Sequence, residues 1–179
     1  MDFLARLMEG NERFRNGRAS ENSYDAERLQ HIARGTDYLG AVLTCVDGRL
    51  SPEIIFDQPL GSFFTCRVPG NTPKDSAVWT FEMAAGAGLP FGLVLGHTEC
   101  IAIGQVVTGV RSDSDVEVAH ASAGTAEDLG KVIRMNAIRT AEETIRKSSL
   151  VREAVARGTF AVRVAIYDVH TGSVSLLDT

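Results

Sequence analysis

Blocks of apolar residues alternate with amphipathic stretches along most of the chain. Three blocks, residues 39–46, 63–68 and 91–96, are continuous and short, and a fourth, residues 160–169, alternates and is rich in β-formers. Short apolar runs bounded by glycines and turn residues are typical of buried strands. A fifth block, residues 174–177, follows the turn at Thr171 and Gly172. That arrangement predicts a hairpin at the end of the chain.

Between the strands, apolar residues recur at helical spacing. The segments predicted as helices are 2–16, 52–58, 75–87, 98–110, 126–147 and 149–157. Residues 18–36 are polar and aperiodic and are interpreted as a linker or arm, and residues 111–125 as a loop or weak helix.

Side chains that can cap helices precede three of these segments. Ser51 stands before Pro52, which favours the first helical position, and Asp75 or Ser76 is suited to cap the helix that follows. Thr125, with an aspartate three residues later, resembles a capping box. These residues therefore set the expected helix starts.

Strands that alternate with helices indicate an α/β fold with a mostly parallel central sheet flanked by helices. The final hairpin would add an antiparallel edge. We expect two parts, an N-terminal helical arm over residues 1–36 and an α/β domain over residues 37–179.

Composition narrows the class of protein. The 179 residues include 18 basic and 23 acidic side chains, giving a net charge of −5. This balance argues against a nucleic-acid partner, whose phosphates require a basic surface. Three cysteines without an apolar leader indicate a reducing compartment, so a cytoplasmic location is expected. The longest uncharged stretch, residues 83–96, is too short to span a membrane and contains a proline.

Two predicted strands end in residues whose side chains can bind a metal or take part in catalysis. Cys45 ends the first strand, with Asp47 and Arg49 just beyond it, and His97 and Cys100 follow the third. In open α/β sheets ligands bind beyond the carboxyl ends of the strands, and parallel neighbours bring those ends to one edge. Two thiols and one imidazole would therefore converge there.

Two cysteines and one histidine form a ligand set that suits zinc, and a catalytic zinc keeps three protein ligands and an open position. Cys66 lies inside the second predicted strand and is interpreted as a core residue. Asp47, held ionised by Arg49, would orient a zinc-bound water or close the metal site.

On these residues, the chain resembles β-class carbonic anhydrases. The motifs CVDGR, RVPGN and HTEC match the family pattern in order and near its spacing, and similarity extends over nearly the whole chain. The resemblance implies Cys45, His97 and Cys100 as ligands of one Zn²⁺ per chain, with Asp47 and Arg49 as a catalytic dyad. It also implies a small-molecule substrate, with zinc-bound hydroxide attacking carbon dioxide to give bicarbonate.

The resemblance further implies a homodimer or a dimer of dimers, in which the N-terminal helix embraces the partner and the active sites lie near the subunit boundary. The expected substrate-binding residues are Gly48, Phe64, Pro69 and Met83.

Several positions depart from the family pattern. Thr36 replaces a glutamine, and further departures are Gly48, Val68, Pro69, Met83 and Ile101. Most of them remove polar groups or add aliphatic bulk, which suits an apolar linear molecule. The alternative function is therefore hydrolysis of carbonyl sulfide or carbon disulfide. An inactive zinc module closed by Asp47 also remains open, as does metal-free thiol catalysis by Cys100 with His97.

Overall fold

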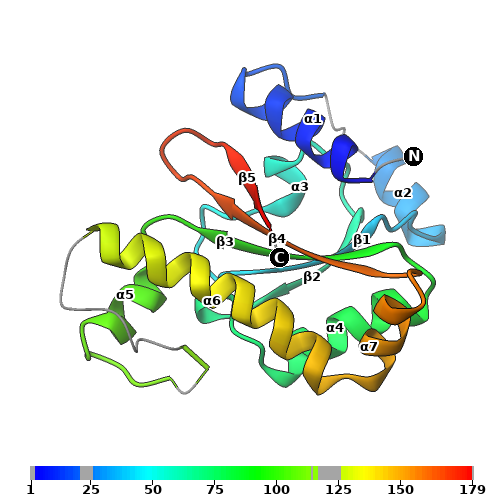
Figure 1. The fold of residues 1–179 in the computed structure, drawn as a ribbon. Coiled ribbons are helices and arrows are strands. Elements are labelled where there is room, and N and C mark those ends of the chain that lie inside the picture. The colour runs from blue at the N-terminus through cyan, green and yellow to red at the C-terminus, as the bar shows by residue number, and fades with distance from the viewer. Residues whose placement is uncertain (1–2, 21–25, 114, 117–125, 179) are drawn as a thin grey trace.

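A five-stranded sheet forms the centre of the molecule (Figure 1), in a computed structural model that describes residues 3–20, 26–113, 115–116 and 126–178. The strands are β1 (Gly40–Thr44), β2 (Phe63–Arg67), β3 (Phe91–His97), β4 (Ala161–Tyr167) and β5 (Val174–Leu177). Their order is β2-β1-β3-β4-β5, with every pair parallel except β4 and β5. The predicted α/β class, the mostly parallel sheet and the antiparallel edge are confirmed.

Helices cover both faces of this sheet, with α4, α6 and α7 on one side and α1 and α3 on the other (Figure 1). The α-helices are α1 (Phe3–Arg15), α2 (Ala26–Arg34), α3 (Pro52–Ile55), α4 (Asp75–Gly86), α5 (Ile101–Val107), α6 (Ala126–Lys147) and α7 (Ser149–Ala156), and η1 (Pro69–Asn71) is a 3₁₀ turn. Every residue of β1 and β3 is buried as a result. None of the helices described here combines the length and the apolarity that crossing a membrane requires.

Helix α1 packs on the sheet of its own chain. Phe3 stacks on Phe91 of β3 with ring centroids 4.2 Å apart, and Asn11 donates hydrogen bonds to the carbonyls of Ile55 and Gly172. Gly10 allows the close approach, because a Cβ there would lie 1.8 Å from the carbonyl oxygen of Phe56. The division of the chain at residue 36 stays a prediction.

The segment interpreted as a linker contains a helix. Residues 26–34 form α2, so the prediction of irregular structure is wrong there. The segment is interpreted as a linker because it is short and mostly polar, with Leu29 and Ile32 as its larger apolar side chains, and the helix buries none of its residues.

The predicted caps are only partly correct. Ser51 occupies the N-cap position of α3 but its side chain makes no capping hydrogen bond. Lys74, rather than Asp75 or Ser76, precedes α4, and both of those residues lie inside the first turn. Thr125 and its predicted capping box fall outside the described residues.

Helix α5 starts at Ile101, later than the predicted residue 98. Glu99 has a φ of 55°, in the left-handed region, and a residue in that region cannot continue a right-handed helix. The chain between β3 and α5 is therefore a loop, and this loop carries Cys100, one of the predicted metal ligands, directly after the strand that ends in His97.

Candidate metal centre

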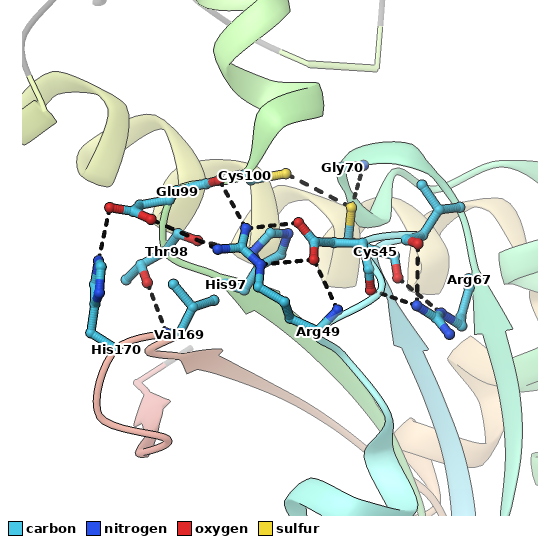
Figure 2. Close-up of polar contacts among 12 residues, drawn as sticks. Cys45, Arg49, Arg67, Gly70, His97, Thr98, Glu99, Cys100, Val169 and His170 are labelled. Atoms are coloured by element: carbon cyan, nitrogen blue, oxygen red, sulfur yellow. Dashed lines mark hydrogen bonds and ion pairs between the residues drawn. The ribbon is translucent and has the colours of Figure 1, made fainter.

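Cys45, His97 and Cys100 meet at the carboxyl edge of the sheet (Figure 2). Cys45 follows the last residue of β1, His97 ends β3, and Cys100 is the N-cap residue of α5. Because β1 and β3 are parallel neighbours, their carboxyl ends lie side by side. The two sulfurs and an imidazole nitrogen all lie within 4.8 Å of one another, and all three residues are buried. Among the described residues, no other group of three such side chains lies as close.

The imidazole of His97 is held in one orientation. Its Nδ1 lies 2.9 Å from the carbonyl oxygen of Thr98, and because a carbonyl can only accept, Nδ1 must carry the proton. The lone pair is then on Nε2, which is buried and has no hydrogen-bond partner among the described residues. A buried polar atom without a partner costs free energy, so this nitrogen fits a metal ligand.

The two thiols form a close pair. The Sγ atoms of Cys45 and Cys100 lie 3.8 Å apart, and the hydrogen bond between them lowers the pKa of Cys45 to about 4 and raises the pKa of Cys100. Two Zn–S bonds of about 2.3 Å at a tetrahedral angle would separate the sulfurs by about 3.8 Å. The donor set and its spacing therefore fit zinc.

Cys66 lies elsewhere, as expected of a core residue. It is buried in β2, and its thiol is 3.8 Å from the hydroxyl of Ser76. It is not among the three converging ligand atoms.

Asp47 and Arg49 form a bidentate pair beside Cys45. Arg49 Nε lies 2.9 Å from Asp47 Oδ1, Nη2 lies 2.8 Å from Oδ2, and the backbone N–H of Arg49 also donates to Oδ1. These hydrogen bonds hold the pKa of the Asp47 carboxyl well below its usual range. Asp47 is therefore a permanent anion and a hydrogen-bond acceptor at neutral pH.

Glu99 and His170 extend this pair toward solvent and were not predicted. Glu99 Oε2 lies 3.8 Å from Arg49 Nη1, and its Oε1 lies 2.8 Å from His170 Nε2 (Figure 2). The hydrogen bond to Glu99 raises the pKa of His170. No sequence pattern signals this pair, because His170 stands 71 positions from Glu99 and only the fold of the β4–β5 turn brings them together.

Arg67, the last residue of β2, is a third residue that sequence reasoning missed. Its guanidinium donates to the carbonyl oxygens of Cys45, Val46 and Asp47 at 3.2, 3.2 and 2.5 Å. It therefore fixes the backbone of the loop that carries Cys45 and Asp47. The motif RVPGN contained this arginine, but its partners are backbone atoms, which no side-chain pattern reveals.

The four predicted substrate-binding residues are divided between two regions. Gly48 is exposed beside Asp47, and Pro69 lines a cavity of about 310 Å³ between η1 and α5. Phe64 instead stacks on Tyr38 with centroids 4.1 Å apart and pairs with Ala41, early in β1. Met83 is exposed near the end of α4, which leads to the amino end of β3. Phe64 and Met83 are thus not brought to the cluster of their own chain.

The chain is similar in sequence to known carbonic anhydrases. A sequence model of the family described as carbonic anhydrase matches residues 40–174. The chain is 29% identical over 187 residues to carbonic anhydrase 2 of Mycobacterium tuberculosis, covering 96% of this chain and 90% of that protein.

Solved structures agree on the fold. The β-carbonic anhydrase CcaA superposes with a TM-score of 0.75 at 19% identity, over 99% of this chain and 89% of that one. A structure described as a tetrameric β-carbonic anhydrase from Sordaria macrospora has a TM-score of 0.69 at 17% identity, over 100% of this chain and 98% of that one.

Proposed function

The chain belongs to the β-class carbonic anhydrase family, and from that premise we propose that it catalyses the reversible hydration of carbon dioxide to bicarbonate. The single observation that carries the proposal is the buried Cys45, His97 and Cys100 cluster, with the Nε2 of its histidine left without a partner among the described residues. Metal-free thiol catalysis by Cys100 with His97 would need only two of these three side chains, whereas a zinc ion would use all three. The carbonic anhydrase names of the relatives favour carbon dioxide as the substrate.

Cys45, His97 and Cys100 would hold one Zn²⁺ per chain. When bound, zinc lowers the pKa of water from 15.7 to about 7 and so supplies hydroxide at neutral pH. The hydrogen bond from His97 Nδ1 to the carbonyl of Thr98 keeps the imidazole in the tautomer that can bind a metal.

Asp47 and Arg49 would form the catalytic dyad. The ionised Asp47 carboxylate accepts a hydrogen bond from the attacking water and orients its lone pair toward carbon dioxide. Arg49 keeps that carboxylate charged and in place through two side-chain hydrogen bonds. Addition of water to carbon dioxide gives bicarbonate and one proton, which must leave to solvent.

We also propose a homodimer or a dimer of dimers. Phe64 and Met83 stand away from the cluster of their own chain, so they would line a substrate pocket only if a second subunit supplied them. Gly48 and Pro69 would line the pocket from the subunit that holds the metal. A cytoplasmic location stays a prediction.

The decisive experiment compares carbon dioxide hydration and carbonyl sulfide hydrolysis on one zinc-loaded preparation. We expect fast carbon dioxide turnover and slow sulfide release, both lost in Asp47→Asn. That variant keeps the size of the side chain but removes its charge.

Two outcomes would contradict the proposal. Negligible carbon dioxide hydration with fast sulfide release would assign the protein to the carbonyl sulfide alternative. Absence of both activities across neutral and alkaline pH, with zinc still bound, would indicate an inactive metal module closed by Asp47.

A further inference from the structure

The sulfur of Cys45 receives a hydrogen bond from the backbone. The N–H of Gly70, in the η1 turn, points at Cys45 Sγ with the nitrogen 3.4 Å away (Figure 2). An N–H donor draws electron density from a thiolate and thereby tunes a metal that the thiolate binds.

Gly70 adopts a left-handed backbone conformation. Its φ of 66° and ψ of 17° lie in the left-handed region, and a Cβ there would lie 2.9 Å from Ile103 Cδ1. Glycine is suited to that conformation and that space, but it also has the widest choice of other conformations. The direction of its N–H therefore depends on what else holds the residue.

Asn136 of α6 holds Gly70 from the other side. Its Nδ2 donates to the carbonyl oxygen of Gly70 at 2.8 Å, and the side chain is buried. Its Oδ1 has no hydrogen-bond partner among the described residues. The amide of Asn136 therefore restrains Gly70 through its NH₂ group.

We propose that Asn136 is a positioning residue for the Cys45 thiolate. By binding the carbonyl of Gly70, it holds this glycine in the conformation whose N–H donates to Sγ. The inference rests on the proposed metal centre. Two thiolates give a metal much negative charge, which opposes acidification of bound water, and a donor on one sulfur offsets part of that charge.

The test uses the full-length protein loaded with Co²⁺, whose sulfur-to-metal charge-transfer band reports the electron density on the thiolates. In Asn136→Leu we expect this band to move to longer wavelength, because sulfur without its donor gives up electrons more easily. Zinc should also leave the zinc-loaded variant about 10- to 100-fold faster, measured with a chromogenic chelator. Asn136→Ala, which cannot overpack the site, should change both quantities in the same direction.

Thr140→Val is the matched control. Thr140 is buried on the same face of α6, one turn from Asn136, and the replacement has the same shape. We expect its band and its zinc release to equal those of the unmodified protein.

Two results would overturn the inference, and they are distinguishable. If the unmodified protein binds neither cobalt nor zinc, the proposed metal centre fails and the inference fails with it. If it binds both, and the Asn136 variants match Thr140→Val in band position and release rate, the proposed function stands and the positioning role alone is wrong.

Discussion

Residues of the same type have different surroundings in this protein, and their position relative to the sheet determines those surroundings. Cys45 and Cys66 are both buried. Cys45 lies just beyond the end of β1, where its sulfur meets His97 and Cys100, whereas Cys66 lies within β2 and faces Ser76. The chemistry of a cysteine here is therefore set by whether it lies beyond a strand or within it.

This contrast gives a prediction for metal content. Cys45→Ser should lose zinc and activity together, because a serine hydroxyl is a poor zinc ligand. Cys66→Ser should keep both and lose only about 1 kcal/mol of unfolding free energy, since its hydroxyl can bond with Ser76. Zinc analysis of the purified variants measures the difference. Loss of metal from Cys66→Ser would mean that the ligand set is wrong.

A second residue-scale prediction concerns pH. The carboxylate of Asp57 is almost fully buried, and although burial raises its pKa, hydrogen bonds from Arg13 and from the N–H and hydroxyl of Ser20 lower it further than burial raises it. Because the folded pKa lies below the unfolded value, the stabilisation is complete above the unfolded pKa. It is lost as pH falls through the folded pKa.

Asp57→Asn should therefore lower the free energy of unfolding by about 2 kcal/mol at neutral pH, and this deficit should shrink on acidification. Urea denaturation at neutral and acidic pH measures it. Glu12→Gln, which removes an exposed ion pair with Arg15, should change stability by less than about 0.5 kcal/mol. An equal deficit at every pH would contradict the role of the charge.

At the scale of elements, the helix starts show what local sequence predicts about N-caps. Ser51 and Ser148 both occupy N-cap positions. Ser148 Oγ accepts from the N–H of Val151 at 3.1 Å and donates to Glu82, whereas the Ser51 side chain makes no capping bond. The residue type therefore predicts where a helix can start, but not whether the side chain makes the capping hydrogen bond.

This pair gives a matched prediction. Ser148→Ala should lower the unfolding free energy by about 1 kcal/mol, because a backbone N–H of α7 loses its acceptor. Ser51→Ala should change it by less than about 0.5 kcal/mol. Urea denaturation of both variants under the same conditions measures the difference, and equal effects would contradict the assignment of the cap.

At the scale of the whole molecule, several large apolar side chains remain exposed. They are Leu29, Val46, Ile54, Leu60, Trp79, Met83, Ile101, Val110, Met135, Leu150 and Leu176. Single apolar residues at the surface are normal, but Val46 and Ile101 directly follow the candidate metal ligands Cys45 and Cys100. A second subunit that covered them would also exclude water from the site.

We therefore expect an assembly in solution. Sedimentation equilibrium should give a mass of two or four times the 19.3 kDa chain. Val46→Asp and Ile101→Asp should shift the protein toward monomer, while Val110→Asp, on the turn after α5, serves as the comparison. A monomeric mass at micromolar concentration for the unmodified protein would contradict the expected assembly.

The sequence by itself determined the succession of strands along the chain, the parallel class of the sheet and the metal-ligand candidates. These depend on local patterns: apolar runs make strands, and a thiol or imidazole at a strand end is evident from residue type. The sequence did not reveal α2, because that helix is short, mostly polar and buries none of its residues.

Only the tertiary structure decided the interactions that act through backbone atoms or across long separations. Arg67 bonds three carbonyls, Asn136 reaches Gly70 from another helix, and His170 meets Glu99 across the sheet edge. A carbonyl or an N–H is present in nearly every residue, so which of them a side chain meets depends on how the elements pack. The candidate ligands are therefore present in the sequence, and the environment that holds them is created by folding.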